Sequence, residues 1–240
     1  MGSVRRRVFF ALMPAILTFA AHPAAVRAET AAYAQMAPVG QYLSPDRQTE
    51  VDLARSAAPL AISLHATVMV LDQHGYQTVS KGTNGFTCLV ERSWMSPFDS
   101  AEFWNWKMRG PICYNPPASR TVLLYTLRRT ELALAGSTKA QMLDRIKGEL
   151  AAKQLPAPEA GSMSYMMSKL GNLGDGVGAW RSHLMFYAPQ ADGAKDGASW
   201  GADLPASPII LDTSHHVVPE PETIFMVAVD HWSDGASAPH

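Results

Sequence analysis

Short apolar runs, each bounded by turn-forming residues, predict β-strands toward both ends of the chain. The continuous run 66–71 is typical of a buried strand, and an Asp-Gln-His-Gly turn leads into a return strand at 76–80. Asn84-Gly85 predicts a further hairpin turn into 86–91, so we expect three consecutive antiparallel strands. Three more strands are predicted at 183–187, 208–212 and 223–229.

Apolar residues at helical spacing predict helices between these two groups of strands. Ser44-Pro45 is typical of a helix start, and Thr138 with Gln141 forms a capping box before another. Residues 121–125 fit a strand as well as a helix. The predicted helices run from 45 to about 57, over 119–135, from 139 to the prolines at 156 and 158, and over 163–170.

Strands, then helices, then strands, without a regular βαβ alternation, predict the α+β class. We expect a single domain at 44–232, with an antiparallel or mixed sheet of about six strands packed by three to four helices. The Ala-rich segment 29–43 is expected to be a loose lead-in, and 233–240 a frayed tail.

The first 28 residues have the three-part pattern of a secretory signal peptide. A basic start, Arg5 to Arg7, precedes an apolar stretch at 8–21, and 26–28 (VRA) suits signal peptidase. The arginines also resemble a twin-arginine export signal, so unfolded and folded export both remain open. We expect a periplasmic or secreted protein without a transmembrane segment after signal removal, because no later apolar run approaches about 18 residues.

Composition and charge limit the class of partner. The chain has 240 residues, 47% of them apolar and 17% charged, which is typical of a globular protein. The signal contains four of the 20 Lys and Arg residues and no acid, so 16 basic and 21 acidic residues remain, a net charge of −5. Nucleic acids and anionic lipids repel such a chain, and we expect neither as a partner.

Cys88 and Cys113 are the two cysteines of the chain. In an exported protein such a pair predicts a disulfide bond, because the compartment is oxidising. A redox or haem role is disfavoured, since neither cysteine lies in a C-x-x-C or C-x-x-C-H motif.

Several short segments form a further signature: GTNGFTC at 82–88, the later Cys113, SYM at 164–166 and WRSHLM at 180–185. They resemble a group of exported bacterial proteins that carry G-[TS]-N-G-W-T-C, a downstream Cys, and a strand with Pro-His-hydrophobic-Met. Phe86 stands where that group has Trp, and Ser182 where it has Pro. The resemblance implies export and a shared scaffold, and it implies no activity.

Residues 197–201 (GASWG) fit the G-x-S-x-G motif of α/β-hydrolases, with Ser199 as the nucleophile. Asp212, His215 and His216 follow in the order of that triad. The motif requires a buried strand before the serine and a helix after it. Here a polar segment precedes it and Pro205 follows, which favours a glycine-rich surface loop.

Histidines and methionines raise the question of a metal site. His215 and His216 are adjacent, so they point in opposite directions in an extended segment and need His183 or His231 to complete a site. A site for the soft ion Cu(I) could be formed by His183 with Met163, Met166, Met167 and Met185. Packing in the hydrophobic core explains these methionines equally well. The glycine-rich loop 171–178 lacks the Lys-Ser/Thr of a phosphate loop. We therefore expect no metal and no cofactor.

Aromatic residues concentrate between Trp94 and Tyr114, at Trp94, Phe98, Phe103, Trp104, Trp106 and Tyr114; all but Tyr114 lie between the two cysteines. Indole rings stack well on sugars and flat ligands, and a disulfide would preorganise such a loop. Alternatively, these rings cover the sheet as part of the core. For the ligand-binding interpretation the candidate residues are Trp94, Trp104 and Trp106, with Tyr165, Trp180, Arg181 and His183 forming the facing wall.

These observations favour a secreted or periplasmic domain that binds a small molecule or an envelope protein without catalysis. One alternative is a hydrolase that uses Ser199 or a His-centred metal site. The other is a structural or accessory envelope protein. No residue is assigned a catalytic role.

Overall fold

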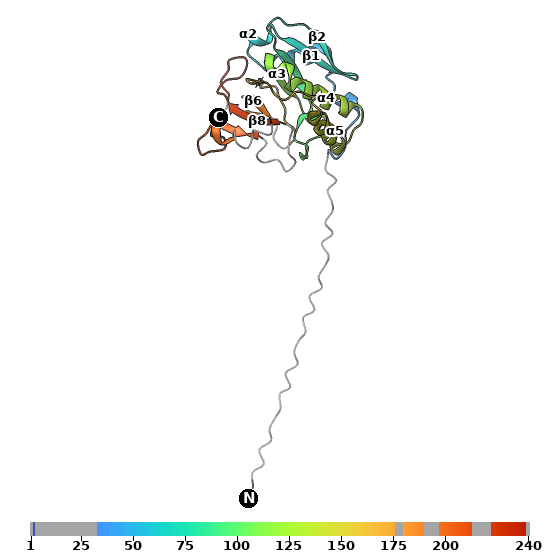
Figure 1. The fold of residues 1–240 in the computed structure, drawn as a ribbon, viewed down its shortest axis with the longest axis vertical. Coiled ribbons are helices and arrows are strands. Elements are labelled where there is room, and N and C mark those ends of the chain that lie inside the picture. Colours follow the sequence, from blue (N-terminus) through green and yellow to red (C-terminus); the bar gives the residue numbers. More distant parts are fainter. Residues whose placement is uncertain (1, 3–32, 176–179, 190–196, 213–221, 239–240) are drawn as a thin grey trace. The chain divides into compact units, whose positions relative to one another are not determined.

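The computed structural model describes residues 2, 33–175, 180–189, 197–212 and 222–238. Within the compact unit formed by residues 31–240, the described strands make one mixed sheet of eight strands (Figure 1). Its order is β2-β1-β3-β4-β5-β6-β8-β7, and all neighbours are antiparallel except β1 and β3. The strands are β1 (Thr67–Asp72), β2 (Gly75–Ser80), β3 (Thr87–Glu91), β4 (Gly110–Tyr114), β5 (Met163–Met166), β6 (His183–Pro189), β7 (Ile209–Leu211) and β8 (Glu222–Ala228).

Helices pack against this sheet, and their starts follow from local capping. The Asp46 side chain accepts from the Thr49 amide at the start of the first helix, and Thr138 and Gln141 form the predicted capping box. None of the helices in the described segments is long and apolar enough to cross a bilayer. The α-helices are α1 (Arg47–Arg55), α2 (Leu60–Ser63), α3 (Pro116–Arg120), α4 (Val122–Leu134) and α5 (Lys139–Ala151), with 3-10 turns at Val39–Gln41 and Ser93–Met95.

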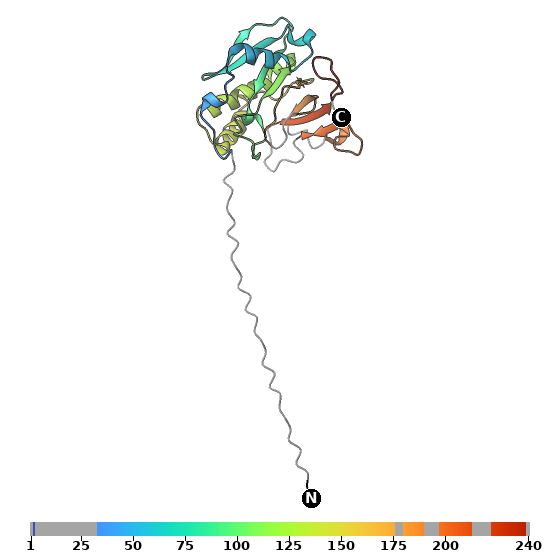
Figure 2. The same cartoon turned by 180° about the vertical axis from the view of Figure 1, so that it is seen from behind.

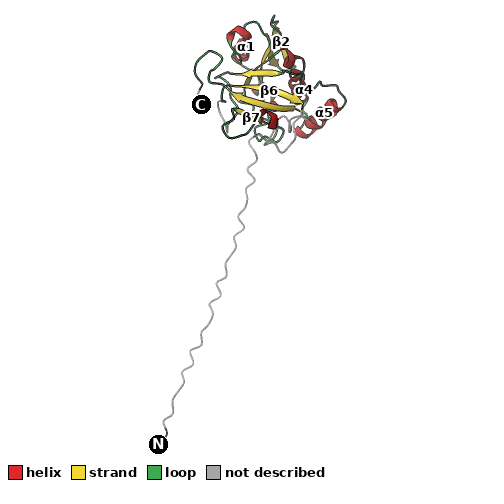
Figure 3. Ribbon diagram, turned by 60° about the vertical axis from the view of Figure 1, so that its left-hand side comes forward, coloured by secondary structure: helices red, strands yellow, loops and turns green. Residues whose placement is uncertain are grey.

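The two faces of the sheet bury different partners, because successive strand residues point in opposite directions. On one face, Val90 and both cysteines pack against Ala54 of α1. On the other, Leu89 and its neighbours pack against α4. The first strands (cyan) and last strands (orange to red) lie at opposite ends of the sheet (Figures 1 and 2), and α5 lies next to α4 (Figure 3). The α+β prediction is therefore confirmed.

The order of the first three strands corrects one prediction. β1 and β2 form the predicted hairpin, but β3 pairs with β1, in parallel, and does not pair with β2. The Asn84 side chain explains the difference: its Nδ2 donates to Ile62 O (2.8 Å) and its Oδ1 accepts from Phe86 N (3.1 Å). A side chain on Gly82 would lie 2.2 Å from Thr67 N, so the chain runs tightly along the start of β1. The Asn-Gly pair therefore makes a side-chain-bonded turn in place of a two-residue hairpin.

The predicted helix at 163–170 is wrong, since Met163–Met166 is strand β5. It pairs with β4 on one side and β6 on the other. A short segment gains little from forming a helix alone, so the unpaired backbone groups of two neighbouring strands decide its conformation. Strand β4, at Gly110–Tyr114, was also not predicted, because it lies in the segment expected to be a loop.

Both flanking segments are held to the domain by specific contacts. In the expected lead-in, Tyr42 is fully buried and its hydroxyl donates to Trp104 O (2.8 Å). In the expected tail, Ser233 N donates to Met167 O (2.9 Å) and Ala238 N donates to Asp230 O (2.7 Å). The described parts of both segments therefore belong to the packed structure.

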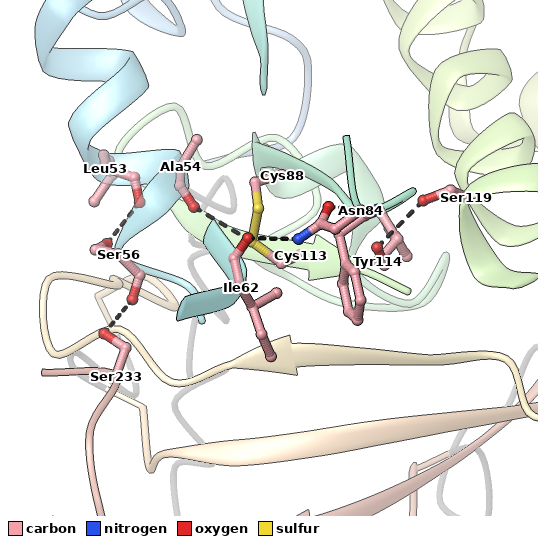
Figure 4. The surroundings of a disulfide bond; sticks show 11 residues. Leu53, Ala54, Ser56, Ile62, Asn84, Cys88, Cys113, Tyr114, Ser119 and Ser233 are labelled. Carbon is pink, nitrogen blue, oxygen red and sulfur yellow. Dashed lines mark hydrogen bonds between the residues drawn. A yellow bond between two sulfur atoms is a disulfide. The ribbon is translucent and has the colours of Figure 1, made fainter. Parts of the chain in front are cut away.

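The predicted disulfide bond between Cys88 and Cys113 is confirmed (Figure 4). The two residues lie directly opposite each other on β3 and β4, with their Cα atoms 4.0 Å apart. Both are fully buried, and Cys113 Sγ lies 3.8 Å from Ala54 O of α1. The bond thus joins the two strands from which the aromatic loop leaves and returns.

Candidate functional site

A cavity of about 290 Å³ lies between α4 and the sheet face that this helix covers. The register explains its floor, because Met166 lies opposite His183, and Met185 lies opposite Met226, all on one face. Apolar side chains make up most of the lining. The floor is formed by Glu91, Gly110, Tyr114, Met166, His183, Met185, Tyr187, Glu222, Ile224 and Met226, and the rest of the wall by Arg92, Met95, Ser96, Pro97, Met108, Val122, Tyr125, Thr126, Arg129, Leu173, Trp180 and Asp212.

Glu91 places a carboxyl group in this largely apolar lining. Its Oε1 accepts hydrogen bonds from the Tyr114 hydroxyl and from Thr126 Oγ1 (3.3 Å). Burial raises the pKa of Glu91 to about 7, and the two hydroxyl donors and the Arg129 charge oppose that rise. Burial and the nearby carboxylate together raise the pKa of Tyr114 as well. The group therefore changes charge close to neutral pH.

Two arginines also line the cavity, and each is held by other groups. Arg92 donates to both carboxylate oxygens of Glu50 (2.8 and 2.9 Å), and both side chains are buried. Arg129, 2% exposed, donates to the Tyr125 hydroxyl (2.9 Å) and to Ser96 O (2.6 Å). Its guanidinium carbon lies 4.1 Å from the centre of the Phe98 ring, which is a cation–π contact.

Trp180 forms a rigid aromatic part of the wall. It is 5% exposed, and its Nε1 donates to Ser168 O (2.9 Å). A side chain on Gly171 would lie 2.5 Å from Cε2 of the indole, so the ring packs directly on the backbone there. A glycine at this position is what allows the indole to lie where it does.

His183 presents a neutral imidazole to the cavity. Its Nδ1 lies 2.7 Å from Arg181 O, and because a carbonyl only accepts, Nδ1 carries the proton and Nε2 keeps a lone pair. Burial lowers the pKa of His183, while the Arg181 carbonyl and the charge of Asp212 partly offset the effect. The ring meets the Trp180 ring edge-on, at 5.7 Å between centres.

The structure brings together two of the seven ligand-binding candidates, Trp180 and His183, in this cavity. Trp94 and Trp104 lie in the core, where Trp94 Nε1 donates to Thr130 Oγ1 (3.0 Å). Trp106 is half-buried and packs against the core, with Lys107 Nζ 5.4 Å from its ring centre.

The other two candidates of the predicted facing wall also lie outside the cavity lining. Tyr165 points to the opposite face of the sheet and contacts Phe86. Arg181 is exposed. The tryptophans of the aromatic loop thus extend the core: Trp94 packs on Tyr42 and Trp104 on Phe103, in a cluster that includes residues of α4 and α5.

The hydrolase motif lies elsewhere. Ser199 is in a helical turn at 197–200 and does not line the cavity, although Asp212 does. His215 and His216 lie outside the described residues. The neighbouring Trp200 stacks on Phe225, with 4.5 Å between ring centres.

The structure brings together only some of the side chains that the sequence suggested as metal ligands. Among the described residues, no group of three or more His, Cys, Asp or Glu side chains could hold a metal ion. Of the proposed soft ligands, Met166, Met185 and His183 line the cavity, and Met163 and Met167 do not. In the glycine-rich loop, Asn172 pairs with Arg109 through two backbone hydrogen bonds of 2.9 Å, while 176–178 lie outside the described residues.

Sequence reasoning missed Glu91 and Arg129. A signal for Glu91 was present, since it follows Leu89 at strand spacing and therefore points to the same buried face. Arg129 follows Tyr125 by one helical turn on an otherwise buried side of α4. A charged residue at an inward position is the pattern that marks such a site.

Comparison with protein-family models, with curated proteins and with solved structures gives no match. The resemblance to the exported bacterial group stays a prediction. The site is therefore interpreted from its own geometry and chemistry.

Proposed function

We propose that this chain is an exported domain that binds a small, largely apolar organic molecule in the cavity between α4 and the sheet. The cavity itself carries the proposal. At about 290 Å³ it lies just below the lower end of the usual range for small-molecule sites, about 300 Å³, and a few fixed polar groups interrupt its apolar lining. Such a composition suits a ligand that is mostly apolar and is oriented by one polar group.

The lining combines adaptable and rigid parts. Thioether side chains such as Met166, Met185 and Met226 adjust to the shape of an apolar ligand. Trp180, fixed by its hydrogen bond to Ser168 O, provides a rigid surface at little entropic cost. This combination supports the binding of a small molecule better than the recognition of a flat partner surface.

The disulfide bond supports export as the cellular context. A buried cystine between paired strands is typical of proteins that fold in oxidising compartments, such as the periplasm or the extracellular space. The hydrolase alternative gains less support, because Ser199 lies outside the cavity lining.

Filling the cavity tests the proposal. We expect the oxidised full chain to bind N-phenyl-1-naphthylamine, a neutral apolar fluorophore, and Met226→Trp to abolish binding because the larger side chain occupies the space. Leu124→Trp on the exposed side of α4 is the matched control, since it adds the same ring outside the cavity. Thermal melts would establish that both variants fold. Equal binding by the two folded variants, or no binding of this probe or of the ligand series below by the natural chain, would contradict the proposal.

A further inference from the structure

Resting on this proposed function, we infer that the ligand is an organic cation with an apolar body, whose N–H-bearing cationic group binds Oε2 of Glu91 beside the Trp180 ring. Two features support this ligand: one oxygen of the Glu91 carboxyl that accepts no hydrogen bond from the described residues, and the aromatic groups around Glu91.

The unused acceptor is the second oxygen of the Glu91 carboxyl. Both hydroxyl donors, from Tyr114 and Thr126, reach Oε1. No hydrogen bond from the described part of the chain reaches Oε2. Glu91 is nevertheless half-buried and lines the cavity, so the surface that it keeps faces that space. A carboxylate oxygen in apolar surroundings is costly to leave without a donor, and a ligand N–H group would supply one.

The Trp180 indole lies close to the base of the Glu91 side chain. A Cβ atom built on Gly110 would lie 3.3 Å from Glu91 Cβ and 3.5 Å from Cη2 of Trp180, so both side chains border the same glycine. The rings of Tyr125 and Tyr187 line the same cavity. Aromatic faces attract a cation, most strongly where water is excluded, so ring and carboxylate favour the same kind of group.

Charged groups of both signs line the cavity. The carboxyl groups are those of Glu91, Asp212 and Glu222. Of the two guanidinium groups, that of Arg92 is balanced by Glu50, which does not line the cavity. The Arg129 guanidinium donates to Ser96 O and the Tyr125 hydroxyl and lies over the Phe98 ring. Among these groups, the charge-complementary partner of a ligand N–H group is a carboxylate, and Glu91 offers one.

A series of three ligands of similar shape tests the inference: 4-phenylbutylamine, 4-phenylbutan-1-ol and 4-phenylbutanoate. By calorimetry on the oxidised full chain at pH 8, we expect the amine to bind at least tenfold more tightly than the alcohol, and the carboxylate to bind most weakly. In Glu91→Gln the preference for the amine should fall to about twofold or less. Glu131→Gln, on an exposed part of α4, is the control and should keep the full preference.

The outcomes separate this inference from the proposed function. If the natural chain binds the alcohol as tightly as the amine, the cationic ligand is refuted while a small-molecule site remains. If Glu91→Gln keeps the full preference, Glu91 is not the anchor. If neither the three ligands nor N-phenyl-1-naphthylamine binds, the proposed function itself fails.

A pH series on the natural chain keeps the inference testable if Glu91→Gln does not fold. The amine stays protonated from pH 6.5 to 8.5, so its affinity should rise several-fold as Glu91 ionises, whereas the affinity of the alcohol should stay constant. The charged and titratable groups around Glu91 are Arg92 just after β3, Tyr114 on β4, Arg129 on α4, His183 and Tyr187 on β6, Tyr76 on β2, Asp212 after β7 and Glu222 on β8. Burial raises the pKa of each tyrosine above 10.0 and lowers the pKa of His183 below its ordinary 6.5, so these groups stay essentially neutral in this range. An amine affinity that does not rise with pH would overturn the inference.

Discussion

The carboxyl group of Glu91, half-buried in the cavity lining, should make the stability of this protein fall as the pH rises toward and through neutrality. Burial raises its pKa from 4.5 to about 7, so between these values the folded chain holds a proton that the unfolded chain has released. The contribution of Glu91 to the free energy of unfolding is therefore fully present below about pH 4.5, and it is lost as the pH rises from there through about 7. The shift corresponds to about 3 kcal/mol once the group is ionised in both states.

Glu91→Gln removes this titration while keeping the shape and an oxygen that can accept from Tyr114 and Thr126. We expect the free energy of unfolding of the variant, relative to the natural chain, to rise by about 3 kcal/mol between pH 4 and pH 8. All other titrations, including that of His183, are common to both proteins and cancel in the difference.

Urea unfolding followed by tryptophan fluorescence, with the disulfide oxidised, measures this difference at a series of pH values. Glu131→Gln should show almost no such trend, because Glu131 is exposed. A difference between Glu91→Gln and the natural chain that does not change with pH would refute the reasoning. So would a natural chain that gains stability over the variant at high pH.

Two further predictions concern the disulfide and the support of Trp180. Replacing Cys88 and Cys113 together by Ala should lower the free energy of unfolding by roughly 3.5 kcal/mol, because the disulfide closes a loop with a sequence separation of 25 residues. Urea titrations of the natural and substituted chains measure this loss, and an unchanged midpoint would contradict the prediction. Gly171→Ala should lower the free energy of unfolding by about 1–3 kcal/mol, because its Cβ would lie 2.5 Å from the Trp180 indole. Gly148→Ala in α5 is the control: its Cβ would meet nothing within 4 Å, and the substitution should raise the free energy of unfolding by about 0.5–1 kcal/mol. Thermal melts distinguish the two variants, and equal effects would contradict the packing of Trp180.

Much of the fold could be predicted from local patterns, because these patterns record which side of each element is buried. The capping box at Thr138 marks the start of α5, and apolar runs mark β1, β6 and β8. The prediction of a helix over 163–170 was wrong because the methionines of this segment fit a helix and a strand equally well. Only the neighbours on both sides decide such a case, since they supply the hydrogen-bond partners.

The candidate site was less accessible to sequence reasoning. Trp180 and His183 could be singled out as aromatic and titratable groups near a glycine-rich segment, and they do line the cavity. Trp94 and Trp104 have the same chemistry, yet they pack into the core. Residue type alone does not distinguish a ring that lines a cavity from one that fills it.

The sequence by itself determined the α+β class, most element positions and the pairing of Cys88 with Cys113, because these depend on local periodicity and on having two thiols. Tertiary structure alone decided that β3 lies beside β1, and that Glu91 faces Tyr114, Thr126 and Trp180. The physical reason is that strand order and register join residues far apart in the chain. A one-residue slip in any pairing would turn the cavity-lining side chains of that strand to the opposite face.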